Sequence, residues 1–167
     1  MKSKENLIFL VIMGSGKSSI GLLVAKKLKL EFVDIDKEIE NEIGLSISKI
    51  FELKGENYFR KFEEKITLKK LKLKSKVISL GGGAFINNII RKEILKNHIS
   101  FWLNLDDKIL IKRIKNSKKR PIAFNASDNE LIELIKKRSN IYSKALYEIK
   151  CDNLSKNAIV KRILEIL

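Results

Sequence analysis

Short apolar segments alternate with helical patterns along the chain. Five runs have the length and flanks of strands: Leu7–Ile12, Glu31–Val33, Lys76–Leu80, Ser100–Leu105 and Glu148–Cys151. Apolar positions at helical spacing predict the helices Lys17–Lys29, Asp36–Ile43, Ile47–Leu53, Asn57–Leu73, Ile86–Lys96, Asp107–Lys115, Asn129–Leu146 and Ser155–Leu167. This alternation predicts a three-layer α/β/α fold, in which helices cover both faces of a parallel sheet. Ligands of such sheets bind at the carboxyl ends of the strands.

A glycine-rich segment joins the first predicted strand to the first predicted helix. The eight residues ending at Ser18 match the phosphate-loop pattern G-x-x-x-x-G-K-[ST] at seven positions. In such a loop the backbone N–H groups of Gly14, Ser15 and Gly16 surround phosphate oxygens. Lys17 reaches the outer phosphates, and the Ser18 hydroxyl ligates Mg²⁺. The segment therefore predicts binding of a nucleoside triphosphate.

One position of this loop departs from the pattern. Val11 stands where the first glycine is expected. A β-branched residue with positive φ is strained by roughly 1–2 kcal/mol, if the position needs that conformation. Weaker nucleotide binding or slower turnover is therefore expected.

Two carboxylates follow the second predicted strand. Asp34 and Asp36 flank Ile35, so both side chains point the same way if the strand geometry continues. One carboxylate is then placed to hold Mg²⁺ or its waters, and the other to accept a hydrogen bond from a substrate hydroxyl. The alternative for Asp36 is a helix N-cap, and one residue can serve both roles.

The third predicted strand ends in three glycines. Gly81, Gly82 and Gly83 follow the apolar segment that ends at Leu80. Glycines at this place indicate either a tight turn or a ligand that lies against bare backbone. A plain turn rarely needs three of them, so the second interpretation is favoured.

Arginine is rare here, since lysine outnumbers it 29 to 6. Arg138 lies close in helical angle to the apolar stripe of Leu131, Ile135 and Tyr142. A buried guanidinium is costly unless it meets an anion, and a ligand carboxylate suits its planar fork. Snorkelling, or pairing with an internal acid, is the alternative.

A second arginine, Arg60, has an alternative of its own. Glu63 and Glu64 follow it at i+3 and i+4 and can pair with it along a helix.

A polar, basic stretch without periodicity, Asn116–Ser127, separates two predicted helices. It contains the only proline of the chain, beside Arg120, and ends in Ser127-x-x-Glu130, a capping-box pattern. Such a loop resembles a mobile lid over about residues 114–127, with an ordinary surface loop as the alternative. Arg120 is placed to close on the transferred phosphoryl group, and Arg113 to stack on adenine.

Composition narrows the class of protein. The 167 residues fit a single domain over 1–167. One cysteine and one histidine cannot build a disulfide framework, a thiolate zinc site or a Ser-His-Asp triad, and His98 is expected to be structural.

Because no apolar run can span a bilayer, we expect a cytoplasmic protein without a membrane partner. The net charge of +15 comes from scattered lysines, so no nucleic-acid partner is expected, although anions such as ATP are favoured.

Five motifs in order resemble the shikimate kinase family over essentially the whole chain. They read M-G-S-G-K-S-S at Met13–Ser19, D-I-D at Asp34–Asp36, F-R-K-F-E at Phe59–Glu63, S-L-G-G-G-A at Ser79–Ala84, and K-R-P at Lys119–Pro121 followed by R-S-N-I-Y at Arg138–Tyr142. The resemblance implies a monomeric enzyme whose parallel strands have the order 2-3-1-4-5. It also implies transfer of the γ-phosphoryl of ATP to the 3-hydroxyl of shikimate, on the route to chorismate and aromatic amino acids.

The same resemblance assigns roles to individual residues. It implies that shikimate contacts Asp36, Arg60, Gly81, Gly82, Gly83 and Arg138. It implies that the nucleotide contacts Gly14, Ser15, Gly16, Lys17, Ser18, Ser19, Arg113 and Arg120. Ser18 and, through water, Asp34 would hold Mg²⁺. Lys17, Asp36 and Arg120 would be catalytic, with Asp36 either orienting the acceptor hydroxyl or taking its proton.

The chain departs from the family in two places. Val11 replaces the usual glycine, and the stretch Asp152–Lys156 lacks the arginine often found near adenine in the loop after the last strand. Two alternatives stay open from the sequence. One is a related kinase with a carboxylate-bearing acceptor such as gluconate, and the other is a non-catalytic nucleotide or nucleic-acid binder with a degenerate loop.

Overall fold

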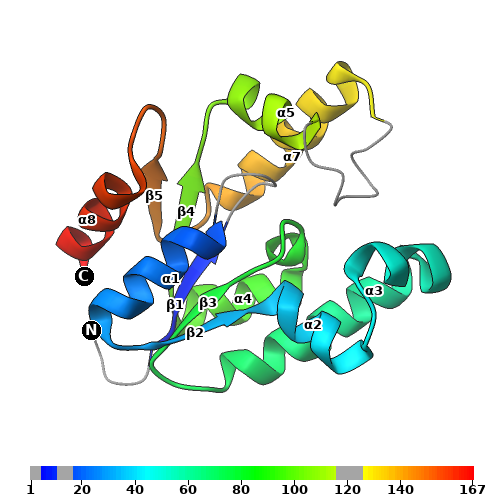
Figure 1. Ribbon diagram of the computed structural model, residues 1–167, viewed down its shortest axis with the longest axis horizontal. Helices are drawn as coiled ribbons and strands as arrows, with labels where there is room; N and C mark the ends of the chain where they lie inside the picture. The colour runs from blue at the N-terminus through cyan, green and yellow to red at the C-terminus, as the bar shows by residue number, and fades with distance from the viewer. Residues whose placement is uncertain (1–4, 11–16, 116–125) are drawn as a thin grey trace.

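The computed structural model describes residues 5–10, 17–115 and 126–167, with the side chains of 17, 113 and 114 outside that description (Figure 1). A five-stranded sheet forms its centre. The strands are β1 (Leu7–Leu10), β2 (Glu31–Asp34), β3 (Lys76–Ser79), β4 (Ile99–Asn104) and β5 (Tyr147–Lys150). All pairings are parallel and the order is β2-β3-β1-β4-β5, which confirms the predicted fold class and strand order.

The central position of β1 follows from its composition. All four of its residues are apolar and buried, at 0–1% exposure. A strand with apolar side chains on both faces fits only where helices cover both sides. Phe9 is in register with Ser79 of β3 and with Phe101 of β4, and the two phenylalanine rings stack at 5.6 Å. The strand therefore delivers the chain to the glycine-rich segment from the middle of the sheet.

Helices cover the sheet on both sides (Figure 1). They are α1 (Lys17–Leu28), α2 (Ile35–Ile43), α3 (Ile47–Leu71), the 3₁₀ turn η1 (Ala84–Ile86), α4 (Asn88–Asn97), α5 (Asp107–Lys115), α7 (Asp128–Tyr142) and α8 (Lys156–Ile166). Helices α1 and α8 contact each other on one side, and α3 and α4 contact each other on the other. Helix α5 follows the carboxyl end of β4, and α7 contacts α5 and η1 and ends beside β4, where Tyr142 meets Trp102 (Figure 1). Within the described ranges, no helix is both long and apolar enough to cross a membrane.

Helix boundaries differ from the sequence prediction in two regions. The helix predicted over Asn129–Leu146 ends at Tyr142. The helix predicted over Ile86–Lys96 is divided into η1 and α4, because the Asn87 side chain accepts hydrogen bonds from the N–H groups of Ile89 and Ile90 and starts a new helix. The capping box of Ser127 and Glu130 is confirmed at the start of α7.

Helix α3 is bent at Gly55, which has φ 80° and ψ 169°. This conformation is essentially restricted to glycine. The sequence predicted two helices, Ile47–Leu53 and Asn57–Leu73. The structure has one helical element here, and its non-helical residue Gly55 lies between the two predicted helices. The bend divides α3 into an outer segment that follows α2 and an inner segment that carries Arg60 and Glu63.

Asn6 joins α3, β3 and the end of α4 at the amino end of the sheet and is fully buried. Its side-chain amide donates to the carbonyls of Leu71 and Leu73 and accepts from Lys76 N–H. Its backbone N–H donates to Nδ1 of His98 at 3.3 Å. The contact confirms a structural role for His98, at the end of the sheet opposite the predicted site.

Candidate active site

Asp34 ends β2 and connects two predicted site residues. Its Oδ2 accepts a hydrogen bond from the Ser18 hydroxyl at 2.6 Å, and its Oδ1 accepts from the backbone N–H of Asp36 at 3.1 Å. Asp34 is therefore the N-cap of α2, and the interpretation of Asp36 as the cap is wrong. The strand stops at Asp34, so Asp36 lies in the first helical turn instead of continuing the alternation of the strand.

The pair of Ser18 and Asp34 has the chemistry of a magnesium site. Both residues present oxygen atoms, which are the ligands that Mg²⁺ prefers. In the part of the chain that the structure describes, no three His, Cys, Asp or Glu side chains form a metal-binding cluster. Mg²⁺ is typically held by one or two oxygen-bearing side chains together with waters and substrate phosphates. The residues present therefore fit the predicted ion.

The glycine triplet lies against the side chains of α2 and α3. A Cβ at Gly81 would meet Oδ1 of Asp36 at 2.6 Å and Oε1 of Glu63 at 2.7 Å. A Cβ at Gly83 would meet Nη1 of Arg60 at 2.6 Å. Neither glycine has positive φ, so close approach and not a strained turn requires them. The structure thus brings Asp36, Arg60 and the triplet together at the carboxyl ends of β2 and β3.

Arg60 is held by two carboxylates of its own helix. Nη1 contacts Oε2 of Glu63 at 2.6 Å, and Nε contacts Oε1 of Glu56 at 3.2 Å. Burial alone would lower the pKa of Arg60, but the charge and hydrogen bonds of Glu63 and then Glu56 raise it above its usual value. The alternative that Arg60 pairs with acids at i+3 and i+4 is thus confirmed only for Glu63. Glu64 accepts from Asn87 instead.

Arg138 is buried at 5% exposure on α7, on the same face as Leu131, Ile135 and Tyr142. This confirms the predicted stripe. One turn further along, the Tyr142 hydroxyl donates to the Gly82 carbonyl at 2.8 Å. The helix that carries Arg138 is thereby attached to the glycine triplet.

Two residues near the site were not predicted from the sequence. Glu63 is 2% exposed and contacts Arg60, whereas the sequence offers it only as a helical i+3 partner of Arg60 and as the last residue of a motif. Its signal was present, because Glu63 shares a helical face with the buried Phe59, Ile66 and Thr67. Tyr142 was assigned to the core, and no sequence pattern indicates its bond to Gly82.

Much of the predicted nucleotide site lies outside the described residues. This holds for Val11, for Gly14, Ser15 and Gly16, and for Arg120, and also for the side chains of Lys17 and Arg113. Ser18 and Ser19 are half-buried in the first turn of α1, which begins at Lys17. The N-terminal end of this helix favours an anion, as the prediction requires.

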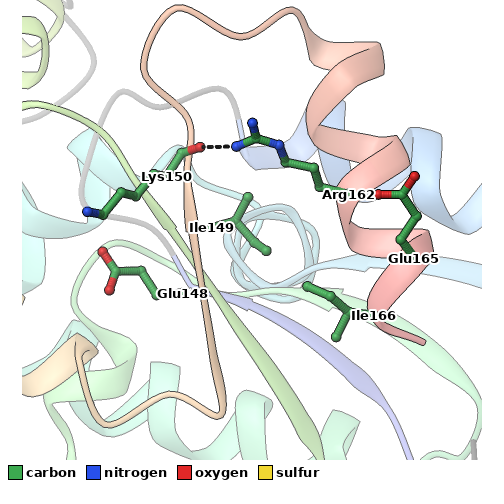
Figure 2. Close-up of a pocket in the computed structure, with 6 residues that line it drawn as sticks. All are labelled: Glu148, Ile149, Lys150, Arg162, Glu165 and Ile166. Carbon is green, nitrogen blue, oxygen red and sulfur yellow. Dashed lines mark hydrogen bonds between the residues drawn. The ribbon is translucent and has the colours of Figure 1, made fainter.

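A cavity of about 470 Å³ lies elsewhere, between β5 and α8 at the edge of the sheet (Figure 2). Its lining consists of Glu148, Ile149, Lys150, Arg162, Glu165 and Ile166. Arg162 donates to the Lys150 carbonyl at 3.5 Å. None of the predicted site residues lines this cavity, so it is not the candidate active site.

Comparisons with known proteins bear on the whole chain. The family model described as shikimate kinase matches residues 13–167. The chain belongs to the shikimate kinase family. The shikimate kinase of Bacillus subtilis is 39% identical over 166 residues, which covers 98% of this chain and 89% of that protein.

Solved structures agree with this assignment. A shikimate kinase from Acinetobacter baumannii in complex with shikimate superposes with a TM-score of 0.91 at 28% identity, over 99% of this chain and 93% of that one. A gluconokinase from Sinorhizobium meliloti, over 99% of this chain and 92% of that one, has a TM-score of 0.61 at 12% identity. The second likeness shows a shared fold only.

Proposed function

We propose that the protein is a shikimate kinase, which transfers the γ-phosphoryl of ATP to the 3-hydroxyl of shikimate and thereby serves the synthesis of chorismate and aromatic amino acids. The observation that carries the proposal is the meeting of Asp36, Arg60 and the glycine triplet beside the Ser18–Asp34 pair. These residues come from four parts of the chain. Family membership supports the same acceptor.

The acceptor site recognises an acid that also carries hydroxyl groups. Arg60 and Arg138 bind the carboxylate of shikimate, because a guanidinium fork matches a carboxylate in shape and charge. The glycine triplet admits the ring close to the backbone. Asp36 orients the acceptor hydroxyl or takes its proton.

The nucleotide site is assigned from the motifs. Main-chain N–H groups of Gly14–Gly16 surround the phosphates, and Ser18 and Ser19 lie at the start of α1. Lys17 and Arg120 stabilise the charge on the transferred group, and Arg113 lines the adenine site. Ser18 and Asp34 would hold Mg²⁺, which would neutralise phosphate charge.

The chain's own task in this reaction is positioning and charge stabilisation. Phosphoryl transfer needs little covalent chemistry from the protein. Holding the acceptor hydroxyl in line with the γ-phosphorus makes the step effectively unimolecular. The described geometry supports this, because Asp34 joins the cap of α2, which carries Asp36, to the first turn of α1.

A coupled assay of ADP release tests the proposal. ATP is supplied with shikimate, with gluconate or with no acceptor, each with Mg²⁺ and with a chelator. ADP release that requires both shikimate and Mg²⁺ is expected, and Arg60→Ala should raise the KM for shikimate strongly. Release that depends on gluconate, or no stimulation by millimolar shikimate, would contradict the proposal. The monomeric state, the cytoplasmic location and the lack of a nucleic-acid partner stay predictions.

A further inference from the structure

The carbonyl groups of the glycine triplet all accept hydrogen bonds, but their donors differ in kind. Gly81 accepts from Ala84 N–H at 3.2 Å and Gly83 from Ile86 N–H at 3.1 Å, both inside the turn that leads to η1. Gly82 accepts from the Tyr142 hydroxyl, which comes from α7 and is 60 residues away in sequence. Among the described residues, Tyr142 thus supplies the long-range bond to these three carbonyls.

This bond fixes the peptide unit between Gly82 and Gly83. Because a trans peptide is planar, holding the Gly82 carbonyl toward Tyr142 also directs the Gly83 N–H to the opposite side of the plane. The Cα of Gly83 lies under the guanidinium of Arg60, since a Cβ there would approach Nη1 at 2.6 Å and Cζ at 2.9 Å. The peptide is therefore held between α7 and Arg60 of α3.

Tyr142 is itself held firmly. It is 1% exposed, its ring lies 5.7 Å from that of Phe85, and it meets Trp102 edge-on at 6.4 Å. Arg138 precedes it by one turn on the same buried face. A displacement of the α7 backbone at Tyr142 relative to Gly82 therefore also moves Arg138 relative to the triplet, because the two residues share one helical turn.

We propose that Tyr142 is a positioning residue for the acceptor site. Its hydroxyl holds α7 against the glycine triplet, so that the two arginines assigned to the carboxylate of the acceptor, Arg138 on α7 and Arg60 on α3, keep a fixed separation. This inference rests on the proposed function. It adds a residue that acts through Gly82 and Arg138, and it attributes a specific effect to the Tyr142 hydroxyl oxygen.

The test removes only the hydroxyl oxygen of Tyr142. Tyr142→Phe keeps the aromatic contacts with Phe85 and Trp102. We expect the KM for shikimate to rise by roughly three- to tenfold, the range that corresponds to one lost hydrogen bond. The KM for ATP and the kcat are expected to stay within about twofold. Calorimetry with shikimate alone should show a rise in Kd of the same size.

Trp102→Phe is the matched control. It alters the same aromatic cluster but leaves the Tyr142 hydroxyl and Gly82 in place, and so is expected to lower stability without changing the KM for shikimate. Trp102 is the only tryptophan and is 5% exposed. Its fluorescence in Tyr142→Phe therefore reports whether the cluster keeps its packing.

The outcomes separate the two proposals. An active natural chain, with a raised KM for shikimate in Tyr142→Phe alone, supports the positioning role. An active natural chain with an unchanged KM in Tyr142→Phe overturns the positioning role and leaves the kinase assignment intact. Equal changes in Tyr142→Phe and Trp102→Phe also overturn it, since they indicate a general loss of packing. A natural chain that neither binds nor phosphorylates shikimate overturns both.

Discussion

At the scale of single residues, the candidate acceptor site depends on two glycines, which have no side chains. Gly81 and Gly83 leave space that Asp36, Glu63 and Arg60 occupy. The sequence offered a turn or a ligand as reasons for three glycines. The structure adds a third, which is contact between the bare backbone and the charged side chains of the site itself.

The effect of an added methyl group at Gly83 can be predicted. In Gly83→Ala the new Cβ displaces the Arg60 guanidinium, which is also bound to Glu63 and Glu56. The KM for shikimate should rise about tenfold or more, since a small misplacement of a positioning group is costly. Steady-state kinetics with varied shikimate measure this.

A double variant identifies the route of this effect. If the methyl group acts through Arg60, adding Gly83→Ala to Arg60→Ala should change the KM little further, because the two residues interact. Fully additive effects would show that the methyl group disturbs the site in another way.

Asp34 combines two tasks that can be separated. In Asp34→Asn the cap of α2 is kept, because asparagine caps helices as well as aspartate does, but the negative charge beside Ser18 is lost. We expect kcat to fall about 10–100-fold, the usual effect of changing a residue that hydrogen-bonds to a metal ligand, with little change in unfolding free energy. Magnesium titrations of activity and urea unfolding measure the two quantities.

Asp34→Ala provides the comparison for that variant. It loses the cap as well as the charge, so its stability should drop by about 1 kcal/mol while its activity resembles that of Asp34→Asn. Natural activity in Asp34→Asn would show that the carboxylate charge has no role in turnover.

At the scale of elements, local signals predicted the existence of each helix better than its ends. The capping box at Ser127 and the break near Gly55 could be found because each acts within a few residues. The early end of α7 at Tyr142 could not, since apolar positions continue to Leu146. The chain leaves the helix because β5 must pair with β4, where Phe101 is in register with Tyr147.

His98, which connects α4 to β4, is expected to make the stability of the protein depend on pH. His98 follows α4, and its Nδ1 accepts from Asn6 N–H. Burial lowers the pKa of His98, and the weaker attraction of Glu93 and Glu5 acts in the opposite direction. Below a pH of about 6.5 the unfolded chain therefore binds a proton that the folded chain resists, and stability falls as the pH falls.

The variant His98→Asn removes this titration and keeps an acceptor for Asn6 N–H in its side-chain oxygen. Urea unfolding at a pH above 7 and at a pH near 5.5 should show a smaller loss of stability in the variant than in the natural chain. Above a pH of about 6.5 the two should depend on pH alike. Parallel curves over the whole range would refute the role of His98.

At the scale of the whole molecule, the net charge of +15 bears on the capture of anionic substrates. Several lysines form ion pairs, as Lys70 does with Glu38 and Lys76 with Glu31. The positive electrostatic field of the protein therefore arises from the other basic residues, which are spread over the surface. A field of this kind raises the local concentration of ATP and shikimate, and salt screens it.

We expect kcat/KM for both substrates to fall several-fold when the ionic strength rises from about 0.01 M to about 0.1 M, because the screening length shortens from about 30 Å to about 10 Å. The kcat at saturation should change little and serves as the internal control. A kcat/KM that is independent of salt would show that the site residues alone, and not the surface charge, attract the substrates.

The sequence by itself determined the order of the strands and helices, including the strand β1 and the helix α1 on either side of the glycine-rich segment, because the patterns that predict them act within a few residues. The burial of Arg138 was also predictable, since helical periodicity places it on an apolar face. Only the tertiary structure decided that Asp34 and not Asp36 caps α2, that Glu63 belongs to the site, and that Tyr142 holds Gly82. The contacts of Glu63 and Tyr142 with the triplet join residues far apart in sequence. The packing of the helices on the sheet decides which residues Glu63 and Tyr142 meet, and patterns within a few residues of the sequence do not contain that information.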